Sequence, residues 1–254
     1  MSGKHLGINL SESHVEFTIL SGSVTVFRTS QVYQGKTDQD RKEAVRKLVE
    51  NNSQLSSDFE NVTLAWSHEK SSLVPAAVFS ETTPKDIFKL CFGSTIDASN
   101  VDHNRIFELS VVNVYSIPDW VKSLFVIKYP QIIIQHAGTH QIRKTLHADA
   151  FYTKATIVLN KEYFRITLVK HNKLEFYSSF EYQTAEDIIY HLNFVLQQKE
   201  LLDEKGMIEI GSNGSVDREI IDTAIEGLGK IQHLEKMKTA YSEAYLTNSQ
   251  LLCV

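Results

Sequence analysis

Residues 10–27 read LSESHVEFTILSGSVTVF, and residues 159–177 read LNKEYFRITLVKHNKLEFY. Aligned from Leu10 and Leu159, the two stretches lie 149 residues apart, and the second has one extra residue in its turn. In both stretches, apolar residues alternate along two short runs that are separated by a turn. This pattern is typical of two half-buried strands joined as a hairpin.

The same order of elements surrounds both hairpins. A further apolar run that predicts a strand precedes each of them, at residues 6–10 and 156–159. After each hairpin comes the same polar pair, Thr37 with Asp40 and Thr184 with Asp187. A Thr followed three residues later by an acid resembles a capping box at the start of an amphipathic helix. Each helix leads into another strand-like run, at residues 62–66 and 207–210. Because five elements recur in the same order, we interpret the chain as an internal duplication.

The remaining sequence predicts elements between and after the two copies. An apolar run at residues 73–79 is interrupted by Pro75, which indicates an edge strand or an extended segment. Residues 105–115 alternate as one long strand. A strand is expected at residues 131–135. Helices are expected at residues 84–92, 118–129, 138–147 and 216–228.

Composition limits the classes of partner. The chain has 254 residues, a net charge of −5 and 42% hydrophobic residues, which is ordinary for a globular protein. No basic stretch marks a nucleic-acid partner, and no apolar run reaches the ~18 residues of a membrane helix. We see no secretory signal, and two cysteines, Cys91 and Cys253, make no disulfide framework. We therefore expect a cytoplasmic protein that neither binds nucleic acid nor spans a membrane.

Two motifs give the duplication a family resemblance. Residues 6–13, LGINLSES, resemble the first phosphate motif of the superfamily that contains actin, hexokinase and the heat-shock chaperone ATPases. Residues 207–214, MIEIGSNG, resemble its adenosine motif. The second copy also resembles the pilus-assembly protein PilM, and the whole chain resembles a Bacteroidetes family of unknown function with a degenerate actin-like fold. The resemblance implies an α/β, duplicated actin-like ATPase fold of the ribonuclease-H-like kind. It also implies two lobes, residues 1–150 and 151–254, with a cleft between them.

The residues at the positions that the resemblance assigns to nucleotide are altered. Phosphate transfer in this fold needs a carboxylate at the end of each central strand and small turns whose N–H groups reach the phosphates. The chain has Asn9 and Val158 where the two carboxylates are expected. The degenerate nucleotide-site positions are Asn9, Ser11, Glu12, Ser13, Asn160, Lys161, Gly211 and Gly214. Side chains in the two turns hinder a close approach of the backbone to phosphate. Hydrolysis is therefore disfavoured, and so are ATP and magnesium as cofactors.

Two polar groups invite other kinds of site. His136, His140 and His147 have helical spacing, and only the first two could share a metal, because the outer pair would lie ~16 Å apart. With no Cys or acid at ligand spacing beside them, ordinary surface histidines are the favoured interpretation. Residues 67–69, Ser-His-Glu, contain hydrolase residue types, but adjacent residues do not form a triad, so a loop is favoured.

Aromatic residues gather in the middle of the chain, at Phe107, Tyr115, Trp120, Phe125 and Tyr129. Core positions are favoured for most of them, and residues 104–129 are the best candidate for a partner surface. The favoured function is a non-catalytic interaction or scaffold protein, a pseudo-ATPase that binds a protein partner, self-associates or attaches to a larger assembly. The alternative is an ATP-dependent phosphotransferase or ATPase with displaced acids, with Glu12 and Glu209 as the first to test.

Overall fold

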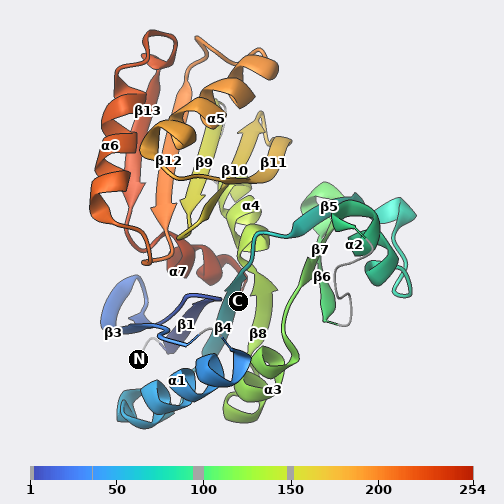
Figure 1. Cartoon of the computed structure of the whole chain (residues 1–254), viewed down its shortest axis with the longest axis vertical. Helices are drawn as coiled ribbons and strands as arrows, with labels where there is room; N and C mark the ends of the chain where they lie inside the picture. Colours follow the sequence, from blue (N-terminus) through green and yellow to red (C-terminus); the bar gives the residue numbers. More distant parts are fainter. Residues whose placement is uncertain (1–2, 36, 94–99, 148–151, 254) are drawn as a thin grey trace. The chain divides into compact units, whose positions relative to one another are not determined.

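The computed structural model describes residues 3–35, 37–93, 100–147 and 152–253, and the chain forms two compact units (Figure 1). The first unit comprises residues 1–140 and 250–254, and the second comprises residues 141–249. The boundary falls within helix α4 (Ala137–His147), whereas the sequence suggested a division at residue 150. The first unit is therefore built from two separate segments of the chain.

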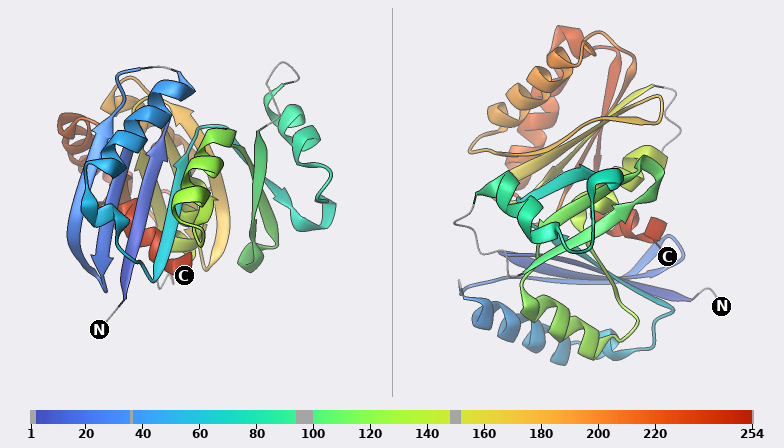
Figure 2. Two further views of the ribbon diagram at one scale, coloured as in Figure 1. Left: turned by 90° about the horizontal axis from the view of Figure 1, so that it is seen from below. Right: turned by 90° about the vertical axis from the view of Figure 1, so that its right-hand side faces the viewer.

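A five-stranded sheet forms the centre of the first unit. Its strands, in the order β3-β2-β1-β4-β8, are β3 (Val24–Val32), β2 (His14–Ser21), β1 (Lys4–Ser11), β4 (Asn61–Ser67) and β8 (Ile133–His136). β1, β2 and β3 pair antiparallel, and β4 and β8 run parallel to β1. Helices α1 (Asp38–Glu50) and α3 (Asp119–Lys128) cover one face of this sheet (Figure 2).

The second unit repeats this sheet. Its order β11-β10-β9-β12-β13 joins β11 (Lys173–Glu181), β10 (Tyr163–Lys170), β9 (Thr153–Leu159), β12 (Gly206–Ser212) and β13 (Met237–Ser242). Helices α5 (Ala185–Gln198) and α6 (Arg218–Gly229) cover one face (Figure 2). A further helix, α7 (Tyr245–Gln250), follows β13.

Details of the two hairpins confirm the predicted duplication. The register shifts between Ile19 and Leu20 in β2 and between Leu168 and Val169 in β10, which are equivalent positions at the 149-residue offset. Both predicted capping boxes are also present, at the starts of α1 and α5. A bulge bends a strand and increases its local twist, so the two hairpins share a local distortion as well as an order of elements.

The first unit also contains a small inserted sheet, and here one prediction is wrong. The expected single strand at residues 105–115 is two antiparallel strands, β6 (Val101–Ile106) and β7 (Val111–Ser116), joined by a 3-10 turn. Ser110 has a φ of 53°, in the left-handed region, and the chain reverses at this turn. The apolar alternation of the sequence continues through the turn, so it did not reveal the reversal. The third strand is β5 (Ser71–Pro75), and α2 (Pro84–Phe92) packs on the sheet.

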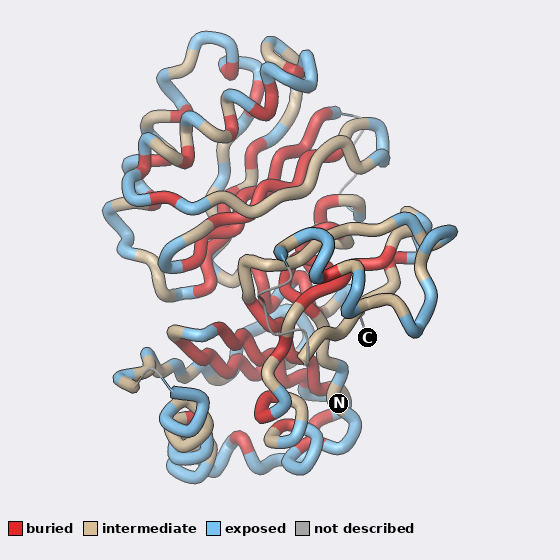
Figure 3. The backbone as a smooth tube through the Cα atoms, turned by 45° about the vertical axis from the view of Figure 1, so that its right-hand side comes forward, coloured by how far each residue is buried: buried red, intermediate tan, exposed pale blue. Residues whose placement is uncertain are grey.

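Each large sheet has one apolar face and one polar face, because successive side chains of a strand point to opposite sides. The apolar faces pack under the helices and form the two main cores. The opposite faces carry polar side chains, which in the first unit are His5, Asn9, His14, Glu16, Thr18, Thr63 and Ser67. In the second unit they are Lys154, Thr156, Arg165, Thr167 and Glu209. Figure 3 shows the central strands buried along much of their length. A buried polar face requires internal hydrogen-bond partners or a ligand.

Candidate functional site

The turn between β1 and β2 is closed by Ser11. Its hydroxyl accepts the backbone N–H groups of Ser13 at 3.3 Å and His14 at 3.1 Å, and it donates to the His14 carbonyl. Ser11 is buried, whereas Glu12 is exposed. A phosphate cradle needs backbone N–H groups that point at the ligand. In this turn, two of those donors already bond to a side chain.

Asn9, at the first expected carboxylate position, belongs to a charged network in the first unit. Its Nδ2 donates to Glu16 Oε1 at 3.0 Å. Glu16 Oε2 accepts two bonds from the guanidinium of Arg28, at 2.6 and 2.7 Å. Asn9 and Glu16 are each 4% exposed. A buried carboxylate is stable only when it is paired and hydrogen-bonded, so Arg28 and Asn9 together explain how Glu16 is tolerated.

The other side of Asn9 is held by the last residue of α7. Gln250 Nε2 donates to Asn9 Oδ1 at 2.6 Å, and Gln250 Oε1 accepts from the Thr63 hydroxyl at 2.7 Å. Thr63 Oγ1 also lies 3.0 Å from His5 Nε2. Because the Thr63 hydroxyl donates its proton to Gln250, its oxygen must accept from His5. The hydrogen of the His5 ring therefore lies on Nε2. Burial lowers the pKa of His5, which favours the neutral ring. Gln250 is fully buried, and its amide connects Asn9 on β1 with Thr63 on the neighbouring strand β4.

The equivalent strand end in the second unit is closed differently. Val158, at the second expected carboxylate position, is fully buried. In the turn that follows, Asn160 Oδ1 accepts from Asn213 Nδ2 at 2.8 Å, and both residues are buried. Asn213 Oδ1 in turn accepts from the backbone and hydroxyl of Ser215. Lys161 lies in the same turn and is exposed. The amide pair therefore connects the turn after β9 with the loop after β12, the segment that resembles the adenosine motif.

Gly211 and Gly214, in the segment that resembles the adenosine motif, both have structural roles. A Cβ on Gly211 would lie 2.5 Å from the Cβ of Tyr245, so the close packing of α7 on β12 requires glycine there. Gly214 has a φ of 86°, which favours glycine, and its N–H donates to Ser212 Oγ at 3.1 Å. Neither glycine needs a nucleotide to explain it.

Two lysines hold Glu209, the acid that the alternative function would use in the second unit. Lys144 Nζ lies 3.2 Å from Glu209 Oε1, and Lys154 Nζ lies 3.1 Å from Oε2. The Lys144 ammonium also lies 3.7 Å from the ring centre of Tyr245. Burial lowers the pKa of Lys144, and the negative charge of Glu209 opposes this shift. Lys144 and Lys154 were not among the predicted site residues, because no local pattern connects α4 with β9.

Two of the predicted surface histidines are in fact buried. His136 and His140 are fully buried, and only His147 is exposed. His136 Nδ1 accepts the Gly138 N–H at 3.1 Å, and His136 Nε2 lies 2.9 Å from the His68 carbonyl. These contacts place the ring in a neutral form with its proton on Nε2. Within the described residues, no three His, Cys, Asp or Glu side chains are grouped to hold a metal.

The Ser-His-Glu tripeptide forms the end of β4 and the loop after it. His68 Nδ1 accepts the Lys70 N–H at 3.1 Å, and His68 Nε2 lies 3.8 Å from Glu12 Oε1. Burial lowers the pKa of His68, while Glu12 and Glu69 act in the opposite direction. The tripeptide is therefore a strand end that passes into a loop, as predicted, and one His68 ring nitrogen accepts a backbone bond within that loop.

Most of the central aromatic residues are in the core. Tyr115, Trp120, Phe125 and Tyr129 are buried, as predicted, and Phe107 is 75% exposed. None of the described helices has the length and apolar character needed to cross a membrane.

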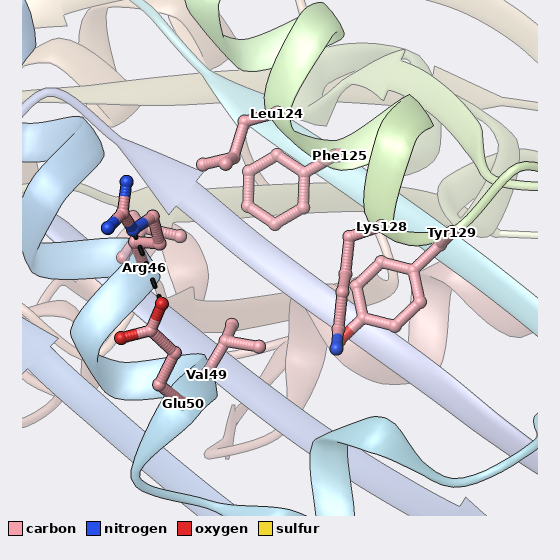
Figure 4. Close-up of a pocket in the computed structure, with 8 residues that line it drawn as sticks. Arg46, Val49, Glu50, Leu124, Phe125, Lys128 and Tyr129 are labelled. Atoms are coloured by element: carbon pink, nitrogen blue, oxygen red, sulfur yellow. Dashed lines mark ion pairs between the residues drawn. The ribbon is translucent and has the colours of Figure 1, made fainter.

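A small cavity lies between α1 and α3 in the first unit (Figure 4). Its volume is about 140 Å³, and its walls are Val45, Arg46, Val49, Glu50, Leu124, Phe125, Lys128 and Tyr129. Arg46 and Glu50, both on α1, form an ion pair at 3.3 Å beside this cavity (Figure 4). Small-molecule pockets have volumes of roughly 300–1,000 Å³, so this cavity is too small for a nucleotide.

Three solved structures are similar to this chain over most of its length. A Bacteroides thetaiotaomicron protein with an actin-like ATPase fold and unknown function is 18% identical, with a TM-score of 0.75, and 100% of this chain matches 97% of that one. The cytoplasmic domain of EpsL, from the Vibrio cholerae type II secretion system, is 10% identical, with a TM-score of 0.54 and coverage of 98% and 95%. A chain of the PilM-PilN type IV pilus biogenesis complex is 11% identical, with a TM-score of 0.57. The match covers 93% of this chain and 90% of that one. At these identities the similarity establishes the fold alone.

No curated protein matches the sequence. The family model described as a protein of unknown function, DUF3822, matches residues 1–225. The chain therefore has an actin-like ATPase fold and belongs to the DUF3822 family.

Proposed function

We propose that this protein is a non-catalytic interaction or scaffold protein, a pseudo-ATPase in which hydrogen bonds within the chain replace the nucleotide. The main support is the buried Gln250 amide, which bonds to Asn9 on β1 and Thr63 on β4 in the first unit. The Asn160–Asn213 amide pair supports the same conclusion for the second unit. A nucleotide that displaced these amides would have to satisfy every buried polar group that they now satisfy.

Interaction is the role that we assign in place of catalysis, because a fold does not determine a function and surfaces remain available. The PilM structure is that of a complex with PilN, and EpsL is a component of a secretion system. These similarities support a protein partner, self-association or attachment to a larger assembly for this chain. We place the protein in the cytoplasm, since Cys91 is an exposed free thiol of the kind that a reducing compartment preserves.

Calorimetric titration with magnesium-ATP tests this proposal. We expect no saturable heat up to millimolar nucleotide and no phosphate release. Micromolar binding with turnover that falls in Glu12→Ala would instead establish the phosphotransferase or ATPase alternative. Glu235→Ala, which removes an exposed Glu outside both turns, is the matched control and should leave any turnover unchanged. A loss of turnover in Lys161→Ala as well as in Glu12→Ala would also contradict the scaffold proposal, because it would place nucleotide at both turns.

A further inference from the structure

The helical layers of the two units differ in charge although their sheets are equivalent. In the second unit, α5 and α6 carry five carboxylates and one basic residue, Arg218, a net charge of −4. In the first unit, α1 and α3 carry five carboxylates and six basic residues, a net charge of +1. The difference is confined to a surface, so it affects which partners approach the second unit and not how its sheet folds.

This negative surface also exposes two aromatic rings. Tyr190 and Phe194 lie one turn apart on α5 and are 64% and 46% exposed. Their ring centres are 6.2 Å apart, and the rings are nearly parallel, at 17°. Glu186 lies one turn before Tyr190 and is also exposed. Residues four apart are neighbours on a helix, so Glu186, Tyr190 and Phe194 form one stripe, here called the aromatic stripe.

The rings of the stripe are connected to the protein core through other aromatic residues. His191 contacts Tyr190 at 5.3 Å and stacks on Phe180 at 4.4 Å. Phe180 contacts Phe164 at 5.7 Å, and Phe164 is fully buried. Side chains that are already ordered lose little freedom when a partner binds. Contacts with His191 and Phe194 restrict the Tyr190 ring, and aromatic side chains supply much of the binding energy at protein interfaces.

We propose that the aromatic stripe binds a Lys- and Arg-rich amphipathic segment of a partner protein. The proposal rests on the proposed function and names the class of partner. Exposed faces of Tyr and Phe attract ammonium and guanidinium groups, and the exposed carboxylate of Glu186 on the same stripe strengthens this preference. A two-fold contact with a second copy would bring two surfaces of the same negative charge together, which disfavours self-association at this surface.

Fluorescence anisotropy with a labelled amphipathic peptide of Lys and Leu, at two salt concentrations, tests the proposal on the full chain. We expect saturable binding that salt weakens. The double substitution Tyr190→Ala and Phe194→Ala should weaken binding by about tenfold or more. Glu186→Lys should weaken it as well and reduce its salt dependence. Phe107→Ala removes an exposed ring from the first unit, and should leave binding unchanged. All four positions are exposed, so circular dichroism should show folded variants.

Three outcomes would overturn the proposal. Equal binding by the Tyr190/Phe194 variant would show that the peptide binds elsewhere, and equal binding of a Glu and Leu peptide of the same pattern would remove the charge argument. A dimer in sedimentation velocity that the double substitution abolishes would assign the stripe to a second copy. The magnesium-ATP titration distinguishes failure of this inference from failure of the proposed function. Failed peptide binding without nucleotide binding removes only this inference, whereas ATP turnover removes the proposed function.

Discussion

Asn9→Asp restores the carboxylate expected at the first strand end, and we predict that it destabilises the first unit. Asn9 Nδ2 donates to Glu16 Oε1 at 3.0 Å. An ionised Asp has no donor there, so the substitution would place two carboxylates against each other. Gln250 could still donate to the new side chain, because it bonds the oxygen that Asn and Asp share.

The cost can be estimated from this geometry. Two unit charges 3 Å apart repel by about 5 kcal/mol at an effective dielectric constant of 20. Keeping the new carboxyl protonated at pH 7 costs about 4 kcal/mol, since its pKa in the unfolded chain is about 3.9. Arg28 offsets part of the repulsion through its pair with Glu16. We therefore expect a loss of about 2–4 kcal/mol at pH 7.

The sign of the pH dependence follows from the raised pKa of the new carboxyl. The folded variant binds more protons than its unfolded state, so its stability falls as pH rises above the unfolded pKa. At pH 5 the electrostatic cost should be no more than about 1.5 kcal/mol. An Asp that gains a cationic partner shows the opposite pH dependence, because its folded pKa is lowered and stability rises with pH.

Urea unfolding followed by tryptophan fluorescence measures the effect, because Trp66 and Trp120 both lie in the first unit. Asn248→Asp makes the same chemical change at an exposed position and is the control. Equal stability of Asn9→Asp and the parent protein at pH 7 would refute the geometric argument. Recovery of the lost stability on adding magnesium would refute the idea that this strand end no longer serves a metal.

Three further predictions concern single side chains. Gln250→Ala strands two buried polar partners and should lower the free energy of unfolding in urea by about 1–3 kcal/mol; an unchanged midpoint would mean that the amide contributes nothing. Gly211→Ala places a Cβ 2.5 Å from Tyr245 and should cost about 1–3 kcal/mol by calorimetry, whereas Gly229→Ala, with nothing within 4 Å, should not. Burial and Arg28 lower the pKa of His14 to about 4, so the unfolded state binds more protons between pH 6.5 and 4 and stability falls by about 3 kcal/mol as pH drops through that window. His14→Gln should flatten this dependence, and identical pH profiles would contradict it.

Elements with local signals were predictable from the sequence. Thr37 and Thr184 form capping boxes because each acts on a backbone N–H three residues away. Pro84 correctly marked the first residue of α2. The single strand expected at residues 105–115 failed because Ser110, with a left-handed conformation, carries none of the Gly or Asn signals that identify such turns.

The site was only partly predictable, because its decisive contacts are remote in sequence. The sequence identified Asn9 as altered, but its partner Gln250 lies 241 positions away. Lys144 and Glu209 meet across 65 positions, in elements that share no local pattern. Gly211 matched a nucleotide-loop pattern, whereas the structure shows that the ring of Tyr245 excludes a side chain there. A motif records which residue is required and not the reason for the requirement.

Asn9 and Val158 occupy equivalent positions and show two ways of closing a strand end without an acid. The hydrocarbon needs no partner, and packing alone stabilises it. The amide keeps a polar interior that must be satisfied, and the chain satisfies it with Gln250, from the segment that completes the first unit. A single cut at residue 150 would therefore separate Asn9 and Thr63 from the amide that holds them. In the first unit, a residue from the second segment of the chain therefore satisfies a polar side chain of the first segment.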